Sequence, residues 1–402
     1  MSVDRIGCNH PVAMRALLAV LALLAAAAAR AEPIEGGRPQ GVDDRFVAEP
    51  PVRVESWVEG LETPWSLVFL PDGRALVSER PGRIRLIEQG RLRDEPYARI
   101  DGTETVGGLF DSVMRLVVGG EAGLMGLALH PDFPRQPYVY AMHTLDGANG
   151  IQNRAIRLRH EGARATPETV IVDGIPGARI HDGGRIAFGP DRMLYVATGD
   201  ASRAALAQDR ASLAGKILRV DAEGAVPNDN PFPGSPVWSL GHRNPQGLAW
   251  HPETRQLFVA EHGPTGEFGL RAYDEINVVV KGGNYGWPRA VGAAGDARYR
   301  DPLVAWPERA TPPGGIAFWR GDLYVTTLRS QALIRVALDR AGEGWRVTAI
   351  ERWFNDGSDG RYGRLRDAVV GPDGALYVLT SNRDGRGSPR RGDDRILRIT
   401  PR

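Results

Sequence analysis

The sequence HDGGRIAFGPDRMLYVATGD, residues 181–200, has the pattern of a β-hairpin. A Gly-Gly pair precedes a short apolar run, Gly-Pro-Asp turns the chain, and a second apolar run returns to Thr-Gly-Asp. Antiparallel pairing would carry His181 and Asp200 to one end of a sheet. An imidazole can accept a proton near neutral pH, and a carboxylate can orient it. The alternative is that both residues only cap turns.

The turn and second strand of this hairpin recur along the chain. A Pro-Asp-type turn followed by a β-branched or aromatic run lies at Pro71, Pro131, Pro190, Pro252, Gly321 and Pro372. The intervals of 60, 59, 62, 69 and 51 residues are too long for a β-helix and typical of four-stranded propeller blades with long loops. We therefore predict an all-β fold, a six-bladed β-propeller with four-stranded antiparallel blades, over residues 51–402. One or two helical turns are expected at 203–208.

The first 31 residues have the features of a secretory signal peptide. Arg15 precedes an apolar run over 16–29, and Ala29-Arg30-Ala31 is a small-x-small cleavage site before Glu32. A membrane anchor is the alternative, although the run is short for a span. We expect a signal peptide at 1–31, a lead-in at 32–50 that is disordered or orders late, no stable membrane span, and a periplasmic or secreted location.

Composition and missing motifs exclude several classes of protein. The formal net charge of +1 gives no reason to expect nucleic acid as a partner. The one cysteine, Cys8, lies in the predicted leader, so any metal would bind to oxygen or imidazole ligands. A Rossmann glycine motif, a phosphate-binding loop, a His-Glu-x-x-His motif and a Gly-x-Ser-x-Gly motif are all absent.

A basic set of residues lies near the ends of the repeats. Arg243 and Asn244 stand beside a proline turn, and a guanidinium fork suits a carboxylate. Arg329 follows a predicted strand. Arg364 and Arg366 alternate on another strand, so both side chains would share a face and could hold one polyanion. The alternatives are a surface turn and a solvated strand edge.

An oxygen-rich set follows in EHGP (261–264), DEIN (274–277) and GGNYGWP (282–288). Carbonyls and carboxylates are hard ligands that suit Ca²⁺ better than a transition metal. Trp287 and Trp306, each followed by proline, offer flat surfaces for a cofactor ring, although a buried aromatic residue is usually part of a core.

These motifs in this order, together with EAGLMGLALHPDF at 121–133, resemble the soluble pyrroloquinoline-quinone (PQQ)-dependent sugar dehydrogenases, the glucose/sorbosone or aldose sugar dehydrogenase family. The similarity runs from about Gly60 to the C-terminus. It implies a secreted propeller that oxidises an aldose at C1 to the lactone with PQQ and Ca²⁺. His181 would remove the anomeric proton, Asp200 would orient the imidazole, and hydride would pass from C1 to the quinone.

The resemblance also implies which residues hold the two cofactors. The backbone carbonyls of Gly263 and Pro264 would hold part of the Ca²⁺ shell. Electrons would leave to an acceptor, either a cytochrome or a membrane quinone. With the ring surface at Trp306 added, the predicted PQQ contacts are Glu121, Arg243, Asn244, His262, Asp274, Trp306, Arg329, Arg364 and Arg366.

Several positions depart from the pattern of the glucose-oxidising members. Glu121 and His262 stand where those members have glutamines, and Leu303 replaces an aromatic residue. A carboxylate at 121 near an anionic cofactor would be protonated, metal-paired or turned away. The link 265–273 is longer than usual, and the loop at 204–205 lacks a polar contact. Two other functions stay open: a Ca²⁺-dependent lactonase and a non-catalytic binding propeller.

Overall fold

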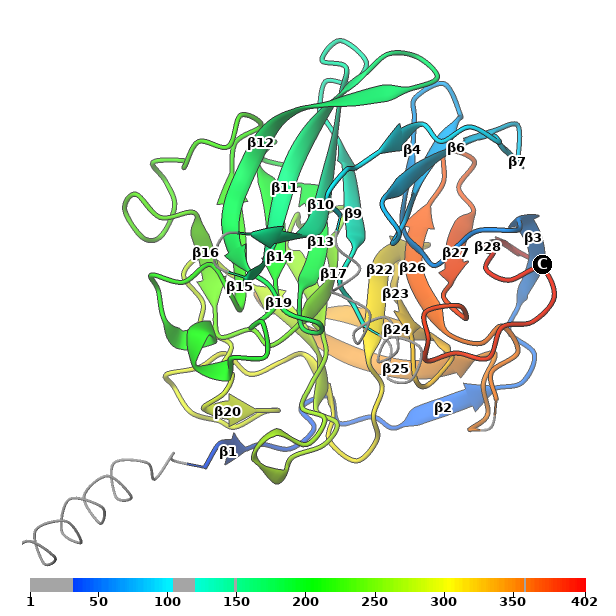
Figure 1. Cartoon of the computed structure of the whole chain (residues 1–402). Helices are drawn as coiled ribbons and strands as arrows, with labels where there is room; N and C mark the ends of the chain where they lie inside the picture. The colour runs from blue at the N-terminus through cyan, green and yellow to red at the C-terminus, as the bar shows by residue number, and fades with distance from the viewer. Residues whose placement is uncertain (1–31, 104–119, 148–149, 358) are drawn as a thin grey trace, which may run out of the picture.

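The computed structural model describes residues 32–103, 120–147, 150–357 and 359–402, so the predicted signal peptide lies outside the described residues. Six antiparallel sheets form six blades, as predicted (Figure 1). Blade 1 contains β4 (Pro64–Phe69), β5 (Ala75–Glu79), β6 (Arg83–Glu88) and β7 (Arg91–Leu92), and β8 (Ala98–Arg99) also pairs with β6. Blade 2 contains β9 (Leu124–Leu129), β10 (Tyr138–Gly147), β11 (Gly150–His160) and β12 (Ala165–Pro176).

The next two blades follow the same order. Blade 3 contains β13 (Gly183–Phe188), β14 (Leu194–Thr198), β15 (Lys216–Val220) and β16 (Val237–Leu240). Blade 4 contains β17 (Pro245–Trp250), β18 (Leu257–Glu261), β19 (Asp274–Val279) and β21 (Val304–Trp306).

The last two blades use strands from the N-terminal part of the chain. Blade 5 contains β22 (Pro313–Trp319), β23 (Asp322–Thr327), β24 (Leu333–Ala341) and β25 (Gly344–Trp353), and β2 (Asp44–Val47) pairs with β25 in parallel. Blade 6 contains β26 (Leu365–Val370), β27 (Leu376–Thr380), β28 (Ile396–Pro401) and β3 (Val52–Val58). Each of the six predicted turns joins the first and second strands of one blade.

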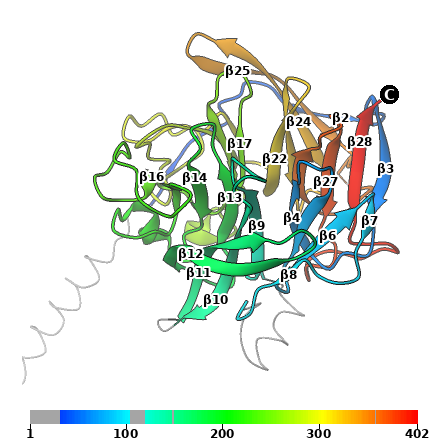
Figure 2. The same cartoon turned by 90° about the horizontal axis from the view of Figure 1, so that it is seen from above.

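The first strands of the blades line the centre and close a ring. Each of β4, β9, β13, β17, β22 and β26 contacts the next, and β26 contacts β4. Figure 2 shows β3 beside β28 near the C-terminus, so one blade is built from both ends of the described chain. Apolar clusters fill the space between neighbouring blades, as where Trp65, Met125 and Ile186 pack together.

The lead-in differs from the prediction. Of the two alternatives for residues 32–50, the disordered segment is wrong, because this segment forms β1 (Ile34–Glu35), paired with β20 (Ala290–Val291), and then β2. The Gln40 side chain donates to the Ala305 carbonyl (3.0 Å) and accepts from its amide (3.2 Å). The backbone and polar side chains of the lead-in thus find partners at the edges of blades 4 and 5, which the composition did not reveal.

Regular helix is limited to short 3₁₀ turns in the described part of the chain. The expected turn after Arg203 is confirmed as η1 (Ala204–Gln208), and a second, η2 (Glu267–Gly269), lies in the long link. The same described part of the chain has no helix long and apolar enough to cross a membrane.

Candidate active site

One rim of the ring collects the residues singled out in the sequence. Glu121, His181 and Asn244 precede the first strands of blades 2, 3 and 4, whereas Asp200 and His262 follow the second strands of blades 3 and 4. Because these strands are antiparallel, both kinds of position meet at the same edge. This topology brings residues from different blades together at one mouth of the channel.

Bulges in the first strands re-aim two further side chains at this rim. The pairing register shifts between Pro245 and Gly247 in β17, and between Leu365 and Asp367 in β26. The residues between them, Gln246 and Arg366, are buried and meet across the ring: Arg366 Nη1 donates to Gln246 Oε1 at 2.5 Å.

His181 and Asp200 form a buried pair, as predicted from the hairpin. The Nδ1 of His181 lies 2.8 Å from Oδ1 of Asp200, and a carboxylate only accepts, so Nδ1 carries the proton. Oδ1 also accepts from the Ser202 amide (2.8 Å), and Oδ2 accepts from the Trp287 indole N–H (2.7 Å). The carboxylate is therefore fixed by the Ser202 amide and the Trp287 indole, and it in turn fixes the imidazole.

The other imidazole nitrogen of His181 faces Arg243. Arg243 Nη2 donates to His181 Nε2 at 2.8 Å, so Nε2 is an acceptor with its lone pair directed to the rim. Arg243 also donates to the carbonyl of His262 (3.2 Å), and its Nε atom is buried without a hydrogen-bond partner among the described residues. The pair thus combines a neutral base with a buried cation.

Glu267, which the sequence analysis did not single out, reaches this centre from the long link. Its Oε1 contacts Arg243 Nη2 and lies 3.7 Å from His181 Nε2, and its Oε2 accepts from the Thr265 amide at 2.7 Å. Partial burial raises the pKa of Glu267, but the Arg243 guanidinium outweighs burial and lowers it to about 2. A side chain of the protein therefore supplies a negative charge next to the candidate base.

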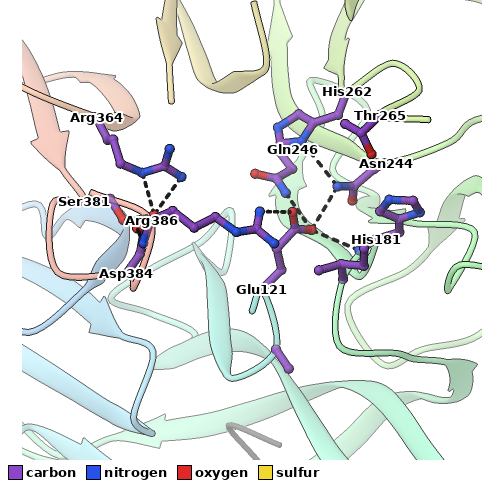
Figure 3. Close-up of polar contacts among 12 residues, drawn as sticks. Glu121, His181, Asn244, Gln246, His262, Thr265, Arg364, Ser381, Asp384 and Arg386 are labelled. Atoms are coloured by element: carbon purple, nitrogen blue, oxygen red, sulfur yellow. Dashed lines mark hydrogen bonds and ion pairs between the residues drawn. The ribbon is translucent and has the colours of Figure 1, made fainter. Parts of the chain in front are cut away.

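Glu121 lies at the centre of a second network (Figure 3). Its Oε2 accepts from the His181 amide (3.0 Å), Asn244 Nδ2 (2.9 Å) and Gln246 Nε2 (3.3 Å), and Oε1 lies 3.7 Å from Arg386 Nη1. Burial raises its pKa, but the surrounding charges and donors hold that pKa below its ordinary value. Glu121 is therefore ionised, and the Arg386 guanidinium balances its charge. Pairing with an arginine was not among the three expectations for this carboxylate.

His262 occupies a buried position beside this network. Its Nε2 lies 2.7 Å from the Pro313 carbonyl, so Nε2 carries the proton, and Nδ1 lies 3.5 Å from Asn244 Nδ2. Burial lowers the pKa of His262 to about 3, so the ring is neutral at physiological pH.

Arg364 and Arg366 lie together, as their alternation predicted. Arg364 donates twice to Oδ2 of Asp384 (Nε and Nη2, both 2.8 Å), and Arg366 Nη2 is 3.9 Å from the same oxygen. Burial lowers the pKa of Arg366 to about 10, which leaves it cationic at neutral pH. Its Nε is buried without a hydrogen-bond partner among the described residues, an arrangement that fits an additional anion.

Three of the predicted PQQ contacts, Asp274, Trp306 and Arg329, are placed differently from the residues of this cluster. Asp274 accepts from the Gly263 amide (3.0 Å) and the Thr311 amide (2.5 Å), so it holds the backbone of the rim. The indole of Trp306 belongs to the apolar core and donates to Asp44 of the lead-in, at 3.0 Å. Burial raises the pKa of Asp274 to about 6, and the exposed Arg329 lies near enough to oppose part of this rise.

The predicted Ca²⁺ position lies beside a small buried cavity of about 20 Å³. Gly263, Pro264 and two buried carboxylates, Glu261 and Glu275, are among its lining residues. Burial and the adjacent Glu261 raise the pKa of Glu275 well above its ordinary value. This donor set of carboxylates and backbone carbonyls fits a hard divalent cation. Among the described residues, no three His, Cys, Asp or Glu side chains group as a metal site, so carbonyls would have to contribute.

A buried ion pair joins the first strands of blades 3 and 6. Arg185 Nη2 lies 2.9 Å from Asp367 Oδ1, its Nε donates to the Gln246 carbonyl (3.0 Å), and its guanidinium lies 4.4 Å from the centroid of the Trp65 ring. Arg185 therefore links residues of blades 1, 3, 4 and 6 in the centre of the ring.

Comparisons with known proteins agree with this arrangement. The sequence profile of the Glucose / Sorbosone dehydrogenase family matches residues 61–397. The chain belongs to this family. Aldose sugar dehydrogenase YliI of Escherichia coli (strain K12) is 30% identical over 388 residues, which cover 89% of this chain and 95% of the relative. The family resemblance and the prediction of an oxidoreductase are thereby confirmed.

Two solved structures are similar over nearly their whole length. A structure from Thermus thermophilus, assigned as a putative oxidoreductase (glucose dehydrogenase), is 53% identical with a TM-score of 0.78, covering 87% of this chain and 100% of that one. The PQQ-bound form of aldose sugar dehydrogenase from Streptomyces coelicolor is 38% identical with a TM-score of 0.74, covering 88% and 99%.

Some residues of the rim escaped the sequence analysis, although two had a usable signal. Gln246 lies two residues after Asn244, directly behind the proline of that turn, and Asp384 lies in the loop that follows the second strand of blade 6. Superposing the repeats aligns Asp200 with Asn382 and would have indicated this loop. Glu267 had no such signal, because it lies in a link outside the repeat.

Proposed function

We propose that this protein is a PQQ- and Ca²⁺-dependent aldose dehydrogenase that oxidises C1 of the sugar to the lactone. The observation that carries the proposal is the His181 imidazole, protonated at Nδ1 on Asp200 and with Nε2 facing the rim where Arg243 lies. The PQQ-bound relative supports the choice of cofactor. When bound, PQQ supplies the hydride acceptor and Ca²⁺ polarises its carbonyl.

The role of His181 follows from its hydrogen bonds. Nε2 accepts the proton of the anomeric hydroxyl, and the sugar hydroxyl replaces the Arg243 N–H that occupies this lone pair in the structure. Asp200 stabilises the imidazolium that results, and the Trp287 indole keeps the carboxylate in position. The protein thus supplies an oriented base in a buried, water-poor setting.

The residues that would hold PQQ are the basic ones of the rim. Arg243 and Arg366 are buried cations with a free Nε each, and three carboxylates on one small molecule suit such guanidinium groups. Asn244 and Glu121 complete the contact surface. The carbonyls of Gly263 and Pro264, together with Glu275, would hold the Ca²⁺.

The remaining parts of the proposal follow from the leader and the reaction. The predicted signal peptide supports a periplasmic or secreted enzyme, and the electrons pass to a cytochrome or a membrane quinone.

A reconstitution experiment tests the function. Purified apoprotein is incubated with PQQ and Ca²⁺, and dye reduction is followed with several aldoses, together with the absorption spectrum before and after sugar. We expect sugar-dependent dye reduction that requires both additions. Lactone opening that needs metal but no quinone would replace the proposal with the lactonase function, and an absence of both activities would refute it.

A further inference from the structure

A cleft beside the His181–Asp200 pair has no part in the function proposed above. Its volume is about 780 Å³, in the range of sites that bind small molecules. The cleft opens between η1 and η2, and the start of the lead-in forms part of its edge. Its lining includes Ser202, Arg203, Gln208, Phe268, Arg289 and Tyr299.

Two walls of this cleft come from the turns that hold Asp200. On one wall, the Ser202 amide donates to the Asp200 carboxylate, and the Arg203 amide donates to the Asp200 carbonyl at 2.9 Å. On the other, the Trp287 indole donates to the same carboxylate, and Arg289 follows two residues later. A sugar that reacts at His181 can therefore extend another of its groups into the cleft.

The uncompensated charge in the cleft is mainly positive. Arg203 and Arg289 are exposed, and neither side chain has a hydrogen-bond or ion-pair partner in the part of the chain that the structure describes. Arg298 is already paired with Asp296 at 2.6 Å. Of the two lining carboxylates, Glu267 is engaged by Arg243, and Glu32 is at the edge of the cleft.

The walls are also held rigidly. The side-chain amide of Gln208 donates to Asn284 Oδ1 (2.9 Å) and to the Trp287 carbonyl (2.7 Å), and it accepts from Asn284 Nδ2 (2.9 Å). The Phe268 ring packs edge-on against Trp287, with centroids 5.9 Å apart. A fixed amide and aromatic wall beside two free guanidinium groups is suited to a polar ring that carries an anionic group.

We propose that this cleft binds an anionic group of the substrate, so that aldoses with a carboxylate or phosphate remote from C1 are preferred over neutral aldoses. The inference rests on the proposed function for the reaction at C1. Arg203 and Arg289 supply the charge-assisted hydrogen bonds that distinguish the two classes of sugar.

Binding to the apoprotein tests the cleft without any turnover. Calorimetric titration with methyl β-D-glucuronide is compared with methyl β-D-glucoside, both blocked at C1. We expect the glucuronide to bind about tenfold more tightly at low ionic strength, with the difference shrinking as salt is added. Equal affinities for the two glycosides would overturn the inference.

Variants of Arg203 and Arg289 show whether these two arginines cause the preference for the glucuronide. Arg203→Gln and Arg289→Gln should each reduce the preference by about three- to tenfold, whereas Arg203→Lys and Arg289→Lys should retain most of it. Arg53→Gln is the matched control, because it removes the same charge from an exposed position on β3 in blade 6. A preference that survives both glutamine variants would refute the assignment.

Turnover by the loaded enzyme gives the second readout. The ratio of kcat/KM for glucuronate or glucose 6-phosphate to that for glucose should exceed one, and should fall in the Arg203→Gln and Arg289→Gln variants. If glucose is oxidised and the ratio is one or below, the cleft inference fails while the proposed function stands. If no aldose is oxidised, the proposed function fails, and the titrations still decide whether the cleft selects anions.

Discussion

Replacing Glu267 by Gln removes the negative charge beside the candidate base and changes little in shape. In the structure this carboxylate contacts Arg243, lies 3.7 Å from His181 Nε2 and accepts from the Thr265 amide. We expect the variant to lose stability but to bind PQQ more tightly. Both effects have the same cause, since Glu267 occupies the guanidinium that an anionic ligand would use.

The loss of stability can be estimated from the pKa of Glu267. Partial burial opposes ionisation, but Arg243 lowers the pKa from 4.5 to about 2, which would correspond to roughly 3 kcal/mol at neutral pH. The side chain is 32% exposed, so solvent screening reduces this to about 1–2 kcal/mol. A chain of this size should then show a decrease in Tm of about 1–3 °C.

The pH dependence of the Tm difference tests whether the ionised form of Glu267 stabilises the fold. Because the folded-state pKa is depressed, the stabilisation by Glu267 is fully present above pH 4.5 and is lost as the pH falls toward 2. The difference in Tm between the wild-type protein and Glu267→Gln should therefore be constant near neutral pH and become smaller below pH 4.5.

The affinity of the Glu267→Gln variant for PQQ should increase, although its stability decreases. If an anionic ligand must displace a contact worth about 1–2 kcal/mol, its removal should tighten binding by roughly 5- to 30-fold. Quenching of tryptophan fluorescence by PQQ in the apoprotein measures this, since Trp287 lies 5.5 Å from the Arg243 guanidinium. Glu253→Gln, at an exposed turn of blade 4, is the matched control. Unchanged stability together with unchanged or weaker PQQ binding would refute the reasoning.

Further predictions concern the His181–Asp200 pair, the basic residues of the rim and the buried Arg185–Asp367 ion pair. His181→Ala should lower kcat by about 10²-fold or more while PQQ still binds by fluorescence; unchanged kcat would remove His181 from the role of base. Asp200→Asn should also lower kcat by about 10²-fold, since an amide no longer fixes the proton on Nδ1, and activity at the wild-type level would contradict this assignment. Arg366→Gln should weaken PQQ binding at least tenfold in the same titration, and unaltered affinity would count against the basic cradle. Asp367→Asn should destabilise the fold by about 3–5 kcal/mol in denaturant unfolding, because Arg185 is left as a buried unpaired cation; a loss below about 1 kcal/mol would show that the pair is not needed.

The blades and the central pair could be predicted from sequence because they obey a repeat. One turn recurs six times, and each copy joins the first two strands of a blade, so the period determined both the fold class and the number of blades. His181 and Asp200 lie at the two ends of one such hairpin. Their meeting at 2.8 Å follows from antiparallel pairing alone.

Contacts made by segments outside the repeated strands were less predictable, because the repeat does not specify where those segments run. Arg364 was expected to face a ligand, yet Asp384 from the loop after β27 pairs with it. Trp306 was expected at a ring surface, but its indole is covered by the lead-in through Asp44. In both cases the partner lies on a segment that has no counterpart in the repeat.

The link 265–273 is the segment whose structure the sequence predicted least. Its two ends are held by other contacts than its middle. Gly263 leaves no room for a side chain, since a Cβ there would lie 2.0 Å from the Ala272 carbonyl oxygen, and Asp274 accepts from the Gly263 amide. Between these pinned ends, Gly266 has a φ of 142°, which lies outside the range of other residues. The Glu267 carboxylate is therefore held chiefly by Arg243 and the Thr265 amide, so an anionic ligand has to break only these contacts and leaves the anchored ends in place.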